Sequence, residues 1–167
     1  VKGIDYEETF APTGRPAAMR LLLAIVAQHP EYEARQIDIS TAYLNADLDV
    51  EIYMEEPEGF VVGGPSKCLK LNKSLYGLKQ SGRNWNKLID SWFRGHGLVP
   101  SPVDPCLYVT ESPHPASFLA ILLHVDDMLI VGPTTEQERV AEALRARFKI
   151  TELGQSKWIL GIRITRD

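Results

Sequence analysis

The sequence contains few of the residues that build metal-bound or disulfide-linked scaffolds. Its 167 residues include only two cysteines, Cys68 and Cys106, which lie far apart and form no Cys-x-x-Cys pair. No histidine stands at ligand spacing from either one. This pattern argues against a structural zinc site and against a disulfide framework, and it favours a reducing, intracellular setting.

Long hydrophobic runs and an excess of positive charge are also missing. The longest apolar runs, residues 21–27 and 118–123, are far shorter than the roughly 20 residues that span a bilayer. Lys and Arg number 18 against 22 Asp and Glu, a net charge of −4. A protein that binds nucleic acid unspecifically, by contacting the phosphates of the nucleic acid, is normally basic. We therefore expect no membrane partner and no unspecific nucleic-acid coat, whereas an enzyme whose carboxylates hold cations is compatible with this charge.

The N-terminus shows neither an initiator Met nor the apolar segment of a signal peptide. The chain starts on Val1 and stops just after an apolar, strand-like run. We therefore expect it to be a piece of a longer protein.

What the sequence does contain is typical of one globular domain. Hydrophobic residues make up 44% and charged residues 24% of the chain. A domain of this length buries about two-thirds of its unfolded surface, which is enough for a core. No internal repeat or low-complexity tract interrupts it.

Hydrophobic periodicity predicts helices and strands in mixed order. The expected helices are residues 16–28, 80–96 and 134–148, and the expected strands are residues 34–39, 51–54, 68–71, 107–110, 117–124, 128–131 and 157–165. The strands and helices do not alternate regularly. This order favours an α+β fold in which helices pack on one face of a mostly antiparallel sheet.

Two adjacent carboxylates stand where the sequence is otherwise apolar. Asp126 and Asp127 separate residues 118–123 from residues 128–131. Buried carboxylates cost several kcal/mol each unless they are paired or bound to a metal, and adjacent like charges add to that cost. The alternative is an exposed hairpin turn, where Asp is common.

A third carboxylate, Asp38, lies near the end of another expected strand. Taken alone it could be an exposed strand-end residue or a helix N-cap. Together with Asp126 and Asp127, it could form one cluster at a sheet edge that holds a pair of divalent cations for phosphoryl transfer. Oxygen ligands without nearby His or Cys suit Mg²⁺ or Mn²⁺ better than Zn²⁺.

Six segments in order carry a resemblance to a known family. They are GIDYEETFAP (3–12), QIDISTAYLN (36–45), IYMEEPEGF (52–60), KSLYGLKQS (73–81), LHVDDMLIVG (123–132), and FKITELG (148–154) with ILGI (159–162). Over nearly its whole length the chain resembles the reverse transcriptase of Ty1/copia-type LTR retrotransposon polyproteins.

The resemblance implies a polymerase palm-like sheet plus part of the fingers. It makes residues 1–167 a single partial reverse transcriptase domain, with residues 1–33 and about 50–80 in the fingers and the remainder in the palm. The thumb and the RNase H domain would lie outside these residues, so the isolated fragment could be inactive.

The implied activity is that of an RNA-directed DNA polymerase. A primer 3′-hydroxyl would attack the α-phosphate of a deoxynucleotide, and pyrophosphate would leave. The resemblance makes Asp38, Asp126 and Asp127 the catalytic residues. These carboxylates and the backbone carbonyl of Ile39 would hold two Mg²⁺ or Mn²⁺ ions.

Further residues match positions that contact substrates in this family. Ile39, Tyr43 and Gln80 would bind the deoxynucleotide. The alternatives are that Tyr43 is a core aromatic and Gln80 a plain helix-start residue. His124, Lys79 and Arg83 would contact the primer or template, and a solvated helix face is the alternative for Lys79 and Arg83. The family usually has Tyr at the position of His124.

The implied partners are an RNA or DNA template-primer, deoxynucleotides, and the RNase H and integrase parts of the polyprotein. The expected location is a retrotransposon particle in the cytoplasm, or the nucleus. Three alternatives remain: an inactive, degenerate relic, a metal nuclease, and a non-catalytic RNA-binding or assembly module. The last would need exposed aromatics on strands and a basic face, whereas the expected strands are mostly aliphatic and the net charge is negative.

Overall fold

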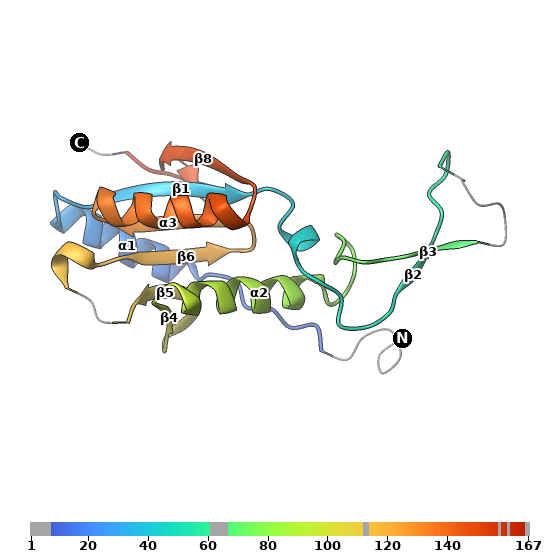
Figure 1. Ribbon diagram of the computed structural model, residues 1–167. Helices are drawn as coiled ribbons and strands as arrows, with labels where there is room; N and C mark the ends of the chain where they lie inside the picture. Colours follow the sequence, from blue (N-terminus) through green and yellow to red (C-terminus); the bar gives the residue numbers. More distant parts are fainter. Residues whose placement is uncertain (1–7, 61–66, 112–113, 157, 160, 166–167) are drawn as a thin grey trace. The chain divides into compact units, whose positions relative to one another are not determined.

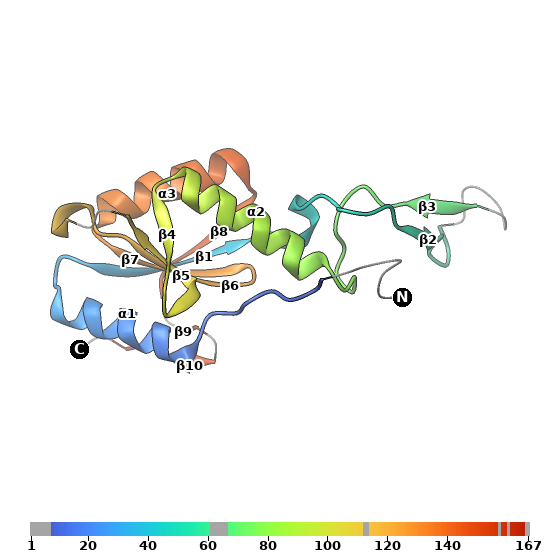
Figure 2. The same ribbon diagram turned by 90° about the horizontal axis from the view of Figure 1, so that it is seen from below.

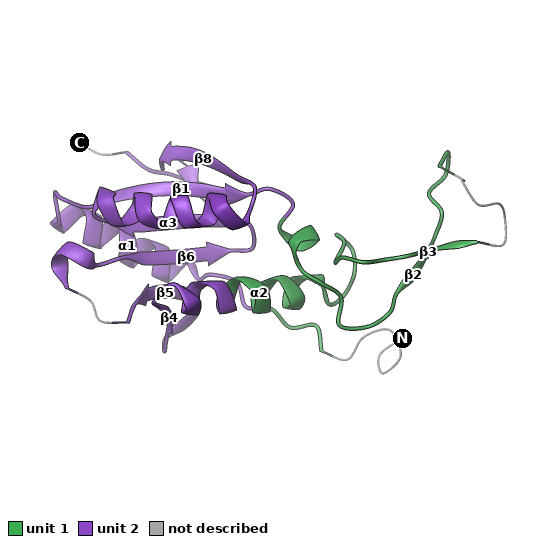
Figure 3. Ribbon diagram, viewed as in Figure 1, with its two compact units in different colours: residues 1–11, 42–89 green, residues 12–41, 90–167 purple. Residues whose placement is uncertain are grey.

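The computed structural model describes residues 8–60, 67–111, 114–156, 158–159 and 161–165 (Figure 1). The chain divides into two compact units (Figure 3). Unit 1 comprises Val1–Ala11 and Ala42–Ile89, and unit 2 comprises Pro12–Thr41 and Asp90–Asp167. Each unit is described separately below.

Unit 2 contains a six-stranded antiparallel sheet in the order β4-β5-β6-β7-β1-β8. Its strands are β1 (Glu33–Ile39), β4 (Leu98–Ser101), β5 (Asp104–Thr110), β6 (Ala120–His124), β7 (Asp127–Gly132) and β8 (Ile150–Gln155). A separate antiparallel pair joins β9 (Trp158–Ile159) to β10 (Ile162–Arg163). The sheet and the helices confirm the expected α+β class.

Helices cover both faces of this sheet. Figure 2 shows α1 (Pro16–Gln28) on one face and α3 (Thr134–Arg147), with the end of α2 (Ser81–Gly95), on the other. The sequence had suggested helices on one face. The central strands explain the second layer, because residues 119–123 and 128–131 are buried without alternation. A strand that is apolar on both sides must be covered on both sides.

Each layer packs through a few large side chains. Pro16 begins α1 at a position where Pro favours helix initiation. The buried side of α1 joins a core with alternate residues of β6 and β7, including Leu122 and Leu129. On the opposite face, Phe93 of α2 packs against Tyr108 of β5 with ring centroids 4.4 Å apart.

Unit 1 holds less regular structure. It contains the short 3-10 helix η1 (Ala42–Asn45), the antiparallel pair of β2 (Tyr53–Glu55) and β3 (Cys68–Lys70), and the first part of α2. A second 3-10 helix, η2 (Pro115–Ser117), belongs to unit 2. The division into fingers and palm at the boundaries expected from the sequence stays a prediction.

The final expected strand, residues 157–165, consists of the two short strands β9 and β10. Gly161 has a φ of +76°, a left-handed conformation that suits a tight turn between them. Residues 157 and 160 lie outside the described part. Among the described residues, no helix has both the length and the apolar character needed to cross a membrane.

Candidate functional site

The two expected carboxylate sites meet at one end of the sheet in unit 2. Strands β1 and β7 pair antiparallel, and the last partners in their register are Asp38 and Asp127. The backbone N–H of Ile39 donates to the carbonyl of Asp126 at 2.9 Å. The end of β1 and the turn before β7 are therefore joined directly, although they are almost 90 residues apart in the sequence.

The turn between β6 and β7 has an uncommon backbone conformation at its first residue. His124 pairs with Asp127, so Val125 and Asp126 form the two-residue turn. Val125 has a φ of +61°. A β-branched residue rarely adopts this conformation, and a two-residue turn of this kind favours Gly there. Asp126 is thus a turn residue, as the simpler interpretation held, while Asp127 starts β7 opposite Asp38.

Burial and charge repulsion act together on Asp38. Loss of hydration on burial raises the pKa of its carboxyl above the ordinary value of 3.8, and the charges of Asp126 and Asp127 raise that pKa further. All three side chains are half-buried at the sheet end. The three carboxylates therefore interact electrostatically, and a bound cation would relieve their repulsion.

Two polar residues that the sequence did not single out support this cluster. The side-chain Nε2 of Gln36 donates to Oδ1 of Asp127 at 3.3 Å. The hydroxyl of Ser156 donates to Oε1 of Gln36 at 3.4 Å. Gln36 and Ser156 are each only 8% exposed. Gln36 stands two positions before Asp38 on β1, so strand alternation places both on one face.

His124 contributes a polar atom that the described structure leaves unsatisfied. Its Nδ1 is buried and has no hydrogen-bond partner among the described residues. Buried polar atoms are normally paired, so an exception beside the three carboxylates is informative. Nδ1 of His124 is therefore available to form a hydrogen bond with a bound molecule.

The donor chemistry at this sheet end fits a divalent cation. Asp38, Asp126 and Asp127 offer hard oxygen ligands, which Mg²⁺ and Mn²⁺ prefer. Across the described ranges, no three His, Cys, Asp or Glu side chains are already grouped closely enough to hold a metal ion. Mg²⁺ is usually held by one or two carboxylates together with water and substrate phosphates, so a complete protein cage is not required.

The expected nucleotide-binding residues lie in unit 1. Tyr43, in η1, is half-buried and its ring centroid lies 4.5 Å from that of Tyr76. Its hydroxyl lies 4.0 Å from the point where a side chain at Gly82 would begin. Gln80 directly precedes α2, is 3% exposed, and accepts the N–H of Asn84 at its backbone carbonyl. Unit 1 thus brings Tyr43 close to the start of α2.

The two basic candidates of unit 1 differ in their surroundings. Lys79 is exposed. Arg83 pairs with Glu8 at 2.9 Å and with Asp49 at 3.5 Å. A phosphate at Arg83 would therefore compete with two carboxylates of the same unit.

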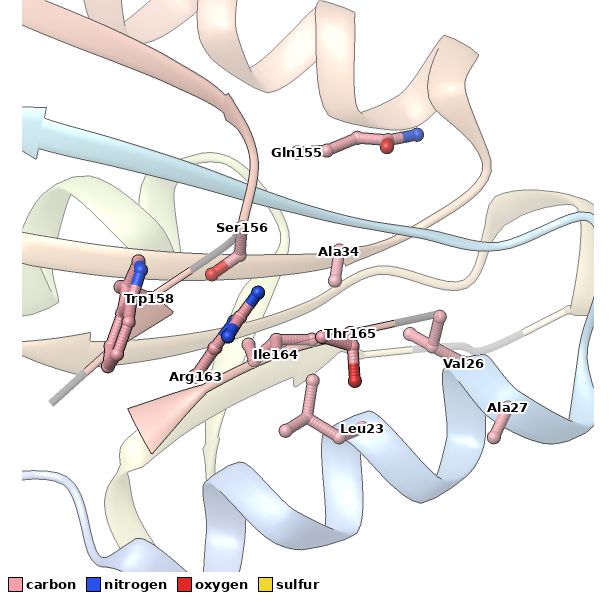
Figure 4. Close-up of a pocket in the computed structure, with 10 residues that line it drawn as sticks. All are labelled: Leu23, Val26, Ala27, Ala34, Gln155, Ser156, Trp158, Arg163, Ile164 and Thr165. Carbon is pink, nitrogen blue, oxygen red and sulfur yellow. The ribbon is translucent and has the colours of Figure 1, made fainter. Parts of the chain in front are cut away.

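Unit 2 also contains a cavity of about 690 Å³ (Figure 4). It lies between α1, β1 and the segment that follows β8. Apolar side chains such as Leu23 and Val26 line one side, and Ser156, Trp158 and Arg163 line another. Ser156 thus both lines the cavity and contacts Gln36.

A family profile and individual relatives both relate this chain to reverse transcriptases. The sequence profile of the family described as "Reverse transcriptase (RNA-dependent DNA polymerase)" matches residues 1–167. The Retrovirus-related Pol polyprotein from transposon TNT 1-94 of Nicotiana tabacum is 41% identical over 170 residues, covering 99% of this chain and 12% of the relative.

Two further Pol polyproteins are similar to this chain in sequence. The Retrovirus-related Pol polyprotein from transposon RE2 of Arabidopsis thaliana is 34% identical, covering 98% of this chain and 11% of its own length. The Transposon Ty1-DR4 Gag-Pol polyprotein of Saccharomyces cerevisiae is 36% identical, covering 75% of this chain and 8% of its own length. The chain thus spans about a tenth of these curated relatives. No solved structure matches it.

Proposed function

Because this chain belongs to the reverse transcriptase family of copia-type Pol polyproteins, we propose that it carries the polymerase centre of such a polyprotein. The reaction is RNA-directed DNA synthesis, in which a nucleotidyl group passes from a deoxynucleoside triphosphate to a primer 3′-hydroxyl. Asp38, Asp126 and Asp127 are the catalytic residues of this proposal.

One observation supports the proposal most strongly. Asp38 lies opposite Asp127 in the β1–β7 register, and Asp126 is tied to β1 by the 2.9 Å bond from the Ile39 N–H. Burial and the charges of Asp126 and Asp127 raise the pKa of Asp38, and such a shift destabilises the ionised fold while being common at functional sites. Their convergence is therefore better explained by a function than by stability.

Asp38, Asp126 and Asp127, with the backbone carbonyl of Ile39, would hold two Mg²⁺ or Mn²⁺ ions. When bound, these ions supply Lewis-acid stabilisation of charge on the reacting phosphates. The protein's own part is positional: the paired strands fix the carboxylates at one sheet end, so little reorganisation is needed during the reaction.

In the same proposal, Tyr43 and Gln80 bind the incoming deoxynucleotide. Tyr43 presents a half-buried ring beside the start of α2, where it would pack under the sugar and disfavour a 2′-hydroxyl. Gln80 offers a side-chain amide at the same helix start. A Tyr43→Ala variant should loosen selection against ribonucleotides.

His124, Lys79 and Arg83 would contact the primer or template. The unsatisfied Nδ1 of His124 at the carboxylate cluster supports the first of these. Further partners would be the RNase H and integrase parts of the polyprotein, and the location would be a retrotransposon particle in the cytoplasm, or the nucleus.

Primer extension on an RNA template with Mg²⁺ or Mn²⁺ tests the proposal. We expect Asp126→Asn to abolish incorporation, because removing a group that acts in a catalytic unit typically costs several orders of magnitude in rate. The assay is run on this chain and on a longer polyprotein segment that carries it.

Asp47→Asn is the matched control. Asp47 is exposed and pairs with Lys73 at 2.5 Å, and exposed ion pairs contribute little to stability. Its activity should equal that of the unaltered protein. Extension by Asp126→Asn at the rate of Asp47→Asn would refute the assignment of the carboxylates.

A further inference from the structure

A buried glutamine connects the carboxylate cluster to the end of the sheet's edge strand. Gln36 donates from Nε2 to Oδ1 of Asp127 and accepts at Oε1 from the hydroxyl of Ser156. Ser156 follows β8, and its backbone N–H donates to the carbonyl of Ala34 on β1 at 3.0 Å. Both ends of the glutamine amide are therefore engaged.

The partners at the two ends of the amide are consistent with one orientation. An ionised carboxylate only accepts hydrogen bonds, so Asp127 takes the NH₂ end of Gln36. The carbonyl end then accepts from the Ser156 hydroxyl. Without Ser156, that end would lose its hydrogen bond and the side chain of Gln36 would be less restrained.

The contact matters because Asp127 has a carboxylate as its cross-strand partner. Asp38 and Asp127 repel each other across the β1–β7 pair. A hydrogen bond from Gln36 to Oδ1 of Asp127 restrains that carboxylate against the repulsion. Groups that hydrogen-bond metal ligands in this way orient them and affect metal affinity.

We propose that Gln36, restrained by its hydrogen bond from Ser156, is a positioning residue that holds the carboxylate of Asp127 for cation binding. This inference rests on the proposed function, since it assumes that the carboxylates bind a divalent cation. It adds two residues, Gln36 and Ser156, that touch no substrate and act through Asp127.

The chain offers a matched control for a buried glutamine. Gln137 is fully buried, and its Nε2 donates to the carbonyls of Glu33 and Gly132, each at 2.8 Å. Glu33 and Gly132 are the partners at the other end of the β1–β7 pair. A Gln137→Met change therefore removes a buried amide of α3 that contacts the same two strands, away from the carboxylates.

The test measures binding of Mn²⁺ directly. The electron paramagnetic resonance signal of the free ion reports how much Mn²⁺ remains unbound. The unaltered chain is compared with Gln36→Met, Ser156→Ala, Gln137→Met and Asp126→Asn, and thermal melts verify that each variant folds. We expect Gln36→Met to weaken Mn²⁺ binding by about tenfold or more, as is typical when a group that orients a metal ligand is lost. Ser156→Ala should produce a smaller loss, and Gln137→Met should bind Mn²⁺ normally.

The outcomes separate this inference from the proposed function. Unchanged Mn²⁺ binding by Gln36→Met, with loss in Asp126→Asn, would overturn the role of Gln36 and leave the cation site in place. Equal weakening by Gln36→Met and Gln137→Met would also overturn it, because the effect would then be one of general stability. If the unaltered chain and Asp126→Asn bind equally or not at all, the cation site and the role of Gln36 both fail.

Discussion

The charge of Asp38 carries an electrostatic cost at the candidate site. Burial and the neighbouring Asp126 and Asp127 raise the pKa of its carboxyl. In the absence of a cation, the ionised form of Asp38 therefore opposes folding. A substitution that keeps the shape and removes the charge should stabilise the metal-free protein while impairing its chemistry.

We expect Asp38→Asn to raise the melting temperature at pH 7 by about 2–4 °C, which corresponds to about 1 kcal/mol in a domain of this size. Because the pKa of Asp38 is raised in the folded state, the stability that its protonated form contributes is complete below the ordinary value near 3.8 and is lost as the pH rises through the folded-state pKa. The advantage of Asn should therefore shrink in acid.

Thermal melts with a chelator present, at neutral pH and below pH 3.8, check this prediction. An equal melting temperature for both proteins at pH 7 would mean that Asp38 experiences no net repulsion in the fold. A stabilisation that persists unchanged in acid would point to packing instead of charge.

For single residues, the sequence revealed the charged residues of the candidate site but not the glutamine that supports them. Asp126 and Asp127 were detectable because carboxylates between apolar runs are anomalous. Gln36 was not, since a glutamine in a strand is unremarkable until its neighbours are known. The only available signal was its position two residues before Asp38, which places both side chains on one face of a strand. Its partner Ser156 lies 120 residues further along the sequence.

Among the elements, the entry into α1 depends on a close backbone approach. A Cβ at Gly14 would lie 2.9 Å from Cδ1 of Leu122 and 2.9 Å from the backbone oxygen of Leu123, both on β6. The next residue, Arg15, donates its backbone N–H to the buried carboxylate of Asp104 at 3.0 Å. The segment before α1 is therefore held tightly against the strand that leads to the β6–β7 turn.

We expect Gly14→Ala to lower the free energy of unfolding by about 1–3 kcal/mol, the usual cost of forcing an extra carbon into a packed site. Chemical denaturation measures this value. Gly95→Ala is the control, because nothing lies within 4 Å of a Cβ at Gly95, the last residue of α2, and Ala is the better helix former. Equal stability of both variants would contradict the close approach at Gly14.

The elements that the sequence missed are edge strands. Strands β4 and β8 lie at the two ends of the sheet order. An edge strand has one unpaired side, so it tolerates Pro100 in β4. In β8 every residue is exposed or half-buried, so no buried apolar face marks it in the sequence. The central strands were predictable because burial on both faces requires continuous apolar residues.

For the whole molecule, the candidates are distributed over both compact units. Unit 2 contains Asp38, Asp126 and Asp127, and unit 1 contains Tyr43 and Gln80. Six ordered sequence segments were enough to predict the family, and the comparisons confirm it. The hydrogen bonds that support the carboxylates could not be predicted, because they depend on the register of β1 with β7 and β8.

The most direct test of the central claim is whether the end of β1 and the β6–β7 turn share one divalent cation. Fe²⁺ in place of Mg²⁺, with ascorbate and peroxide, produces hydroxyl radicals that cut the backbone beside the bound ion. We predict two cuts, near Asp38 and near residues 125–127, that excess Mg²⁺ suppresses and that Asp126→Asn abolishes. Cuts at only one of these segments, or cuts that Asp126→Asn leaves unchanged, would contradict a shared cation site.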